Sequence, residues 1–323
     1  MQKKWMFLMG LGVLFSMASM SVAADTDYPT RSIEVVIGAR EGGGTDVLTR
    51  VLTDKAREIL GKEFVIINKT GGGRVVLTPL ASAKPDGYSL GAITSSWITF
   101  VPLFEKVSYD PFNYTLLLKF GTLDFGVFVL PDSPFKTMKD IIDYARANPG
   151  KFTMGVTQVN SANHVALEVL CRKENVKMTF VPFGGANPTT LALLGGHVMA
   201  ASSATSGFAR QTRAGQVRVL CMMSDERMDD FPDVPTLKEL GYEDLVFQSH
   251  YLIVAPKNLD KAVAEKLEDT FRKAVESPQF IKVAKDISAY SKPMYMDALD
   301  KWRLDEYNTN KKHVETLGLK QIK

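Results

Sequence analysis

The fold is decided first by residues 33–52, which read IEVVIGAREGGGTDVLTRVL. Ile33–Ile37 is mostly apolar and predicts a strand. From Val47 onward, apolar residues recur at the spacing of a helix as far as Gly61, a residue type typical of the position just beyond a helix C-terminus. This stretch therefore predicts a strand, a glycine-rich loop and a helix.

The same unit recurs along the chain. Further strands are predicted at 64–67, 89–94, 114–120, 124–130, 152–155, 178–181, 198–201 and 217–222, and two consecutive strands at 245–255. Helices are predicted from Thr137, at 164–173, 189–194, 260–276 and 296–317. Strands that alternate with helices favour parallel-rich sheets of the α/β class.

The consecutive strands indicate where the chain passes between two lobes. We predict lobe 1 from residues 24–122 plus 248–323 and lobe 2 from residues 123–247, with hinges near Gly121–Phe125 and Val246–Tyr251. Two interdomain crossings of this kind leave a cleft, and ligands of open α/β sheets bind beyond the carboxyl ends of the strands.

The N-terminus predicts export. Lys3 and Lys4 precede an uncharged apolar run, and small residues follow it up to Ala24. This pattern is typical of a cleavable signal peptide, residues 1–23, and the run is shorter than the roughly 20 residues that a membrane-spanning helix needs. We therefore expect a periplasmic protein.

Composition and motifs exclude several functions. The 39 Lys and Arg against 36 Asp and Glu give a formal charge of +3, too small for a nucleic-acid-binding face. No G-x-S-x-G or H-E-x-x-H motif occurs, and the four histidines are scattered, so we predict no catalytic residues, no metal site and no cofactor, in a monomer. Cys171 and Cys221 either form a disulfide or remain free and buried.

Two loops between a strand and a helix are candidate anion sites, because glycine amides and a helix N-terminus attract negative charge. In the first loop, a tight turn capped by Thr45 or Asp46 is an equally good interpretation. In the second, His164 is more often a structural hydrogen-bonding residue. The candidate ligand-binding residues are Ala39, Arg40, Gly43, Gly44 and Thr45 in the first loop; Thr157, Asn160, Ser161 and Asn163 in the second; and Ser95, Ser96, Gly185, Ala186 and Ser203 at other strand ends.

A series of motifs then resembles one family. Gly42-Gly43-Gly44-Thr45-Asp46, Pro85-Asp86-Gly87-Tyr88, Asn148-Pro149-Gly150 and Pro232-Asp233-Val234-Pro235-Thr236 follow one another as in the periplasmic solute-binding receptors of tripartite tricarboxylate transporters, the Bug or TctC type. The resemblance implies a two-lobed periplasmic binding protein fold, type II-like. It implies capture of a small organic anion and its delivery to membrane permease subunits. In such receptors the loops equivalent to 39–45 and 157–164 hold a carboxylate through amides, hydroxyls and water.

The chain departs from the family pattern where the ligand is expected. Gly38-Ala39-Arg40-Glu41 replaces the usual Pro-Phe-Ala-Pro, and Arg40 either clamps a second carboxylate or pairs with Glu41 at the surface. Ser203 stands where many relatives carry an Asp suited to an ammonium group. We therefore expect a non-amino ligand, a di- or tricarboxylate or an aromatic acid, with Trp97 as a wall for a flat one. The alternatives are an exported sensory receptor for a carboxylate or an exported hydrolase.

Overall fold

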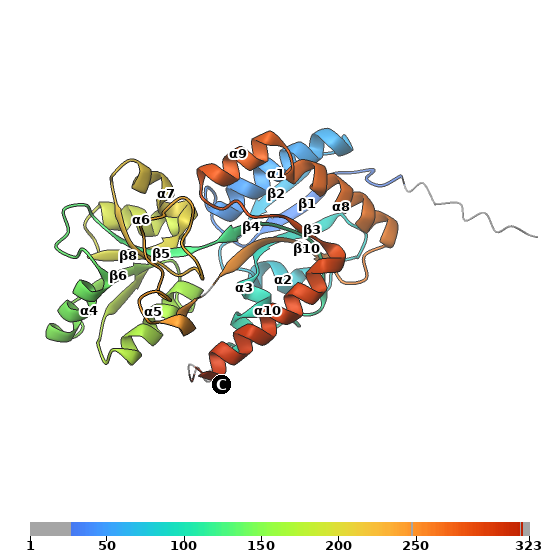
Figure 1. Cartoon of the computed structure of the whole chain (residues 1–323). Helices are drawn as coiled ribbons and strands as arrows, with labels where there is room; N and C mark the ends of the chain where they lie inside the picture. Colours follow the sequence, from blue (N-terminus) through green and yellow to red (C-terminus); the bar gives the residue numbers. More distant parts are fainter. Residues whose placement is uncertain (1–26, 247, 317, 319–323) are drawn as a thin grey trace, which may run out of the picture.

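The polypeptide forms two separate β-sheets, which lie side by side and are flanked by helices (Figure 1). The computed structural model describes residues 27–246, 248–316 and 318, so the predicted signal peptide lies outside the described residues. The long strands β4 (Tyr114–Leu123) and β10 (Ser249–Pro256) lie where the chain passes between the two sheets.

The first sheet has six strands in the order β11-β4-β10-β3-β1-β2. Its remaining strands are β1 (Ile33–Ile37), β2 (Phe64–Asn68), β3 (Ser89–Thr94) and β11 (Met294–Tyr295). β1 pairs in parallel with β2 and β3, with Ile33 opposite Phe64 and Glu34 opposite Ser89. β10 lies between β3 and β4 and runs antiparallel to both.

The second sheet repeats this plan in the order β7-β6-β8-β5-β9. Its strands are β5 (Phe125–Val129), β6 (Thr153–Val156), β7 (Thr179–Pro182), β8 (Ala200–Ala204) and β9 (Arg218–Met222). β6 pairs in parallel with β7 and β8, whereas β5 runs antiparallel to β8 and β9.

The α/β class is as predicted, and both sheets are mixed: parallel pairs around β1 and β6 stand beside antiparallel pairs around β10 and β5. The parallel strands end at the edges that face each other across the molecule. β5 and β10 enter their sheets from that side, directly from the other half of the chain, and so run opposite to the neighbouring β8 and β3. A parallel neighbour would need a crossover connection instead.

Helices cover both faces of each sheet. The first sheet is covered on one face by α1 (Gly44–Leu60), α8 (Lys261–Val275) and α9 (Pro278–Asp286), and on the other by α2 (Arg74–Leu80), α3 (Ser96–Thr99) and α10 (Met296–Thr316). The second sheet is covered by α4 (Met138–Ala147) and α5 (Ala162–Lys173) on one face and by α6 (Ala186–Leu194) and α7 (Thr205–Arg213) on the other. Successive β10 residues, Tyr251 and Leu252, enter different apolar cores, as strand geometry requires.

Local sequence signals were accurate where they were strong. The predicted start of α4 is confirmed, because Thr137 Oγ1 accepts the Asp140 N–H and the Asp140 carboxylate accepts the Thr137 N–H. The two consecutive strands expected at 245–255 were wrong: a short 3₁₀ turn at Glu243–Leu245 precedes the single strand β10. The helices α3, α7 and α9 were not predicted.

Both cysteines are free and buried, Cys171 on α5 and Cys221 on β9. Of the two possibilities that the sequence left open, the structure thus has the unbridged one. Among the helices in the described part of the chain, none combines the length and the apolar character needed to cross a membrane.

His250, near the start of β10, is a partly buried residue whose ring nitrogen Nδ1 is buried, in the segment that joins the two halves. Its backbone N–H donates to Ser95 Oγ at 3.0 Å, and its carbonyl accepts the Ser95 N–H at 2.8 Å. Burial, together with the nearby charge of Lys119, lowers the pKa of His250 from 6.5 to about 3. The imidazole is therefore neutral in the folded protein at neutral pH.

This burial predicts a pH-dependent stability. The unfolded chain takes up a proton near pH 6.5, so the contribution of neutral His250 is complete above that pH and is lost as the pH falls toward about 3, by about 1.4 kcal/mol per pH unit. Urea unfolding of the His250→Asn variant at about pH 7, 6 and 5 should show a slope of unfolding free energy against pH that is reduced by about one proton. The exposed His197→Asn variant should keep the wild-type slope, and an unchanged slope in His250→Asn would contradict the assignment.

Candidate ligand-binding site

A cavity of about 320 Å³ lies between the two halves of the molecule. Most of its lining comes from the strand ends and the strand-to-helix loops of both sheets: 38–41, 43–45, 72–73, 92–94 and 96–97 from the first, and 157–162, 184–188, 204 and 206 from the second. The carboxyl ends of β1, β3, β6, β7 and β8 therefore open onto one space, as expected for a ligand site in an α/β protein.

Four helices, α1, α5, α6 and α7, begin at this cavity. Their N-cap residues are Gly43, Ser161, Gly185 and Ala204, and in the described chain no side chain of these residues accepts a hydrogen bond from a backbone N–H of its helix's first turn. The first N–H groups of a helix have no partner within the helix and carry partial positive charge. The cavity thus combines several uncapped helix N-termini, an arrangement suited to an anion.

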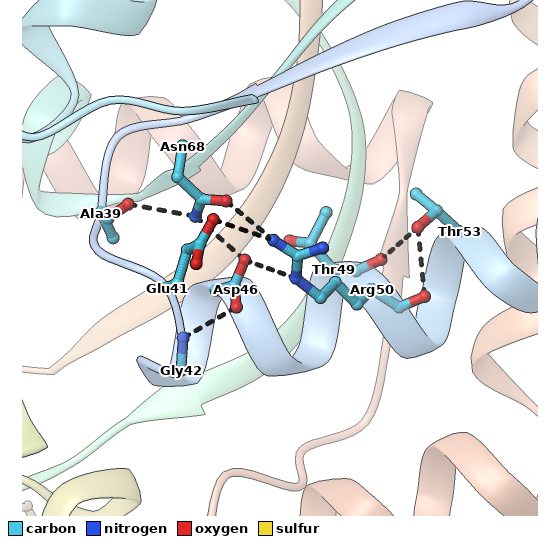
Figure 2. Close-up of polar contacts among 8 residues, drawn as sticks. All are labelled: Ala39, Glu41, Gly42, Asp46, Thr49, Arg50, Thr53 and Asn68. Atoms are coloured by element: carbon cyan, nitrogen blue, oxygen red, sulfur yellow. Dashed lines mark hydrogen bonds and ion pairs between the residues drawn. The ribbon is translucent and has the colours of Figure 1, made fainter. Parts of the chain in front are cut away.

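The loop before α1 is shaped by the buried carboxylate of Asp46, whose side chain is 4% exposed (Figure 2). Its Oδ2 accepts the Gly42 N–H at 2.8 Å, and its Oδ1 accepts from Arg50 Nε at 2.8 Å and from Asn68 Nδ2 at 2.9 Å. Asn68 Nδ2 also donates to the Ala39 carbonyl at 3.2 Å. Asp46 therefore holds the loop, but the expected cap by Thr45 or Asp46 was wrong, because Gly43 is the N-cap and no side chain caps α1. The N–H groups at the start of α1 are left to the cavity.

Gly44 lets groups from the other parts of the chain approach the start of α1. A Cβ at this position would lie 2.2 Å from the Tyr251 hydroxyl and 2.7 Å from Ser206 Oγ. These two hydroxyls hydrogen-bond each other, and burial raises the pKa of Tyr251. The phenol therefore stays protonated and presents a neutral hydroxyl beside the helix N-terminus.

The second loop is organised by Asn163, which is fully buried. Its Oδ1 accepts from Ser161 Oγ at 2.8 Å and from Thr157 Oγ1 at 3.2 Å, and its Nδ2 donates to the Ser202 carbonyl at 2.9 Å. His164 Nδ1 accepts the Asn160 N–H at 3.2 Å, and burial lowers the pKa of His164. His164 thus has the structural role that was favoured from the sequence.

Besides the bond between Tyr251 and Ser206, two more hydrogen bonds join the halves across the cavity. Asn160 Nδ2 donates to Glu105 Oε1 at 2.7 Å, and the other oxygen of Glu105 accepts from Arg74 at 2.6 Å. On α6, Asn187 Nδ2 donates to the Gly42 carbonyl at 2.7 Å. Since each bond links a loop of one sheet to a loop of the other, they stabilise the closed arrangement seen here.

Gly72 and Gly73 leave room for Trp97, which forms an aromatic wall of the cavity. A Cβ at Gly72 would lie 1.9 Å from Trp97 Cζ2, and one at Gly73 would lie 2.4 Å from Trp97 Cγ. Tyr109 holds the same segment by donating its hydroxyl to the Trp97 carbonyl at 2.6 Å. Only glycine backbone lets the indole approach this closely, and Trp97 lines the cavity.

Most of the residues proposed from the sequence come together at the cavity. Those in its lining are Ala39, Arg40, Gly43, Gly44, Thr45, Ser96, Thr157, Asn160, Ser161, Gly185 and Ala186. Ser95, Asn163 and Ser203 are fully buried and do not line it. Ser95 hydrogen-bonds to β10 residues, and Asn163 hydrogen-bonds within its own loop. Ser203 Oγ donates to the Ala204 carbonyl at 3.3 Å. All three side chains therefore support neighbouring groups of the protein and do not face a ligand.

Several lining residues were not proposed from the sequence. Glu105, Ser206 and Tyr251 belong to the lining but were not proposed. Ser206 starts a helix that periodicity did not predict, and Tyr251 lies within an apolar strand. Glu105 carried no local signal, because its role depends on partners distant in sequence, Arg74 and Asn160.

The pairing of Arg40 with Glu41 that the sequence left open is not seen. Glu41 instead lies 3.9 Å from Arg50 (Figure 2). The described residues also include no group of three or more His, Cys, Asp or Glu side chains placed to hold a metal ion.

Known proteins are similar to this chain in sequence and in fold. A family model described as "Tripartite tricarboxylate transporter family receptor" matches residues 48–319. The UPF0065 protein in the gbd 5' region of Cupriavidus necator is 36% identical over 310 residues, covering 94% of this chain and 93% of that protein. The structure of periplasmic binding protein BugD has a TM-score of 0.82 at 24% identity, covering 91% of this chain and 100% of that one. Rpa4515 of R. palustris, solved with adipate, has a TM-score of 0.82 at 24% identity, covering 90% and 99%.

The hydrogen bonds of Asp46 predict a large cost of its removal. Asp46→Ala should lower the free energy of unfolding by about 2 kcal/mol, because it leaves the Gly42 N–H and the Asn68 amide without their acceptor while Arg50 remains partly solvated. Asp54→Ala, an exposed position on the same helix, should change it by less than about 0.5 kcal/mol. Chemical unfolding measures both, and equal effects would show that Asp46 does not hold the loop.

The contact between Gly72 and Trp97 can be tested in the same way. Gly72→Ala should destabilise the protein by about 3 kcal/mol or more, because it adds a clash with the indole to the strain of a φ of +71°. Gly61→Ala is the matched control, with a φ of +65° and no atom near the added Cβ, and should cost about 1 kcal/mol. Equal losses in the two variants would mean that the Trp97 contact contributes nothing.

Proposed function

Because this chain belongs to the tripartite tricarboxylate transporter receptor family, a family of solute-binding receptors rather than enzymes, we propose that it captures a small organic carboxylate and delivers it to a tripartite tricarboxylate-type membrane permease. The ligand is a di- or tricarboxylate or an aromatic acid. The observation that carries this proposal is the opening of uncapped helix N-termini from both sheets onto one cavity. Adipate, found with the similar Rpa4515, is a ligand of this chemical class.

The charges of the lining favour a ligand without an amino group. The described lining contains two carboxylates, Glu41 and Glu105. Glu41 has Arg50 as its ionic partner and Glu105 has Arg74, so an ammonium group would meet no free counter-charge. Ser203, from which a ligand without an amino group was first expected, is fully buried and does not line the cavity.

Capture requires that the cavity open and close. We propose that the two lobes, residues 24–122 plus 248–323 and residues 123–247, move about the passages between the sheets. The bonds Asn160–Glu105 and Asn187–Gly42 form on closure and present one joined surface to the permease. The protein acts in the periplasm as a monomer, after removal of residues 1–23.

Binding can be measured by calorimetry on the mature chain. Adipate or an aromatic acid should bind and be recovered unchanged, whereas aspartate and glutamate should bind weakly or not at all. Gly44→Ala should weaken binding at least about tenfold, because its methyl group meets Tyr251 and Ser206 at the start of α1. Gly61→Ala adds the same methyl group at the other end of α1, outside the cavity lining and with no atom within 4 Å, and should bind as wild type. Tight binding of aspartate without any response to the other acids would refute the proposal.

A further inference from the structure

The cavity has a second chemical feature besides its amides: a free cation beside exposed apolar side chains. We propose that the ligand is a dicarboxylate with an apolar body, in which Arg40 binds one carboxylate and the hydrocarbon between the two charged ends contacts apolar residues of both lobes. This rests on the proposed carboxylate-receptor function and narrows it to one ligand class.

Arg40 is the only Lys or Arg in the described lining of the cavity. Its side chain has no hydrogen-bond or ion-pair acceptor among the described residues, since Glu41 lies with Arg50 instead. Glu105, which also belongs to the lining, is bound by Arg74 and Asn160. The cavity therefore holds one full positive charge that nothing in the described chain neutralises.

The Arg40 side chain extends from one lobe to the other. Its guanidinium nitrogen lies 3.2 Å from the place where a Cβ of Gly184 would be, so the side chain extends from the loop after β1 to the loop after β7. Gly184 has a φ of +81°, which favours glycine, and the missing side chain gives the guanidinium its space. The adjacent start of α6 adds partial positive charge, so a carboxylate is the complement of this corner.

The apolar residues lie in the same cavity. Val159 and Leu191 are 62% and 63% exposed, more than any other large hydrophobic side chain in the described residues, and both belong to the lining. On the side of the first sheet, the lining includes Trp97 and Val101. One ligand explains both features, because its hydrocarbon would cover the exposed apolar side chains and its carboxylate would neutralise the Arg40 guanidinium.

The cavity size agrees with such a ligand. Its volume of about 320 Å³ is at the lower end of the roughly 300–1,000 Å³ range of small-molecule sites. A short hydroxylated diacid would leave Val159 and Leu191 against water, and a monocarboxylate would leave Arg40 without a partner. A diacid with several methylene groups satisfies both.

The test compares adipate, its monomethyl ester and tartrate by calorimetry on the full mature chain. Wild type should bind adipate at least about tenfold more tightly than either of the others. Arg40→Gln should weaken adipate binding by about thirtyfold and binding of the monomethyl ester by less than about threefold. Leu191→Asn should weaken adipate binding by about fivefold and leave tartrate binding unchanged. Arg210→Gln and Leu304→Asn change exposed residues outside this cavity and should behave as wild type.

The outcomes separate this inference from the proposed function. If wild type binds none of these acids, and no tricarboxylate or aromatic acid either, the carboxylate-receptor function itself fails. If it binds a tricarboxylate or an aromatic acid but not adipate, the dicarboxylate assignment is overturned while the receptor function stands. Suppose that wild type binds adipate, and that Arg40→Gln either weakens the binding of adipate and of the monomethyl ester equally or changes neither. The role of Arg40 is then overturned, while the receptor function stands. If wild type prefers tartrate, or Leu191→Asn weakens tartrate and adipate alike, the apolar-body assignment is overturned. Arg40 and Leu191 are both exposed, so their substitution should leave the fold intact, and circular dichroism of the two variants checks this.

Discussion

The hydrogen bonds of one buried carboxylate, Asp46, determine what the cavity can bind. Asp46 accepts from the Gly42 N–H, Arg50 and Asn68, and so fixes the glycine loop in front of α1 without capping the helix itself. If the carboxylate bonded to the first turn instead, it would place negative charge where a ligand anion has to sit. The protein thus satisfies a buried charge with groups behind the loop and keeps the helix N-terminus free for the ligand.

The mixed sheets put the second half of the site opposite the first. β10 enters the first sheet and β5 the second from the side where the parallel strands end. The loops after those parallel strands therefore face one another across a single cavity. Polar groups fix the closed arrangement at its edges, through Asn160 with Glu105 and Asn187 with Gly42, while the middle of the lining remains largely neutral and partly apolar.

Sequence patterns located the elements that local chemistry specifies. Alternating strands and helices, the capping box at Thr137 and the glycines at 42–44 identified the class of fold and the two principal loops. They failed where neighbours distant in sequence decide the structure. α7 begins with Thr205, Ser206 and Gly207, which are weak helix formers, and packing against α6 and β8 stabilises it. In the sequence Ser95, Asn163 and Ser203 look like the other candidates, yet Ser203 lies within β8 and all three side chains are fully buried.

The amino-acid sequence by itself determined that this is an α/β receptor with glycine-rich and hydroxyl-rich loops at strand ends, because strands, helix starts and turns depend on residues close together in the chain. Only the tertiary structure decided that Arg40 reaches Gly184, that Tyr251 and Ser206 meet at Gly44, and that Glu105 joins Asn160. Each of these contacts brings together residues from different elements or different sheets. Their distances follow from how the elements pack, which no local pattern of residues specifies.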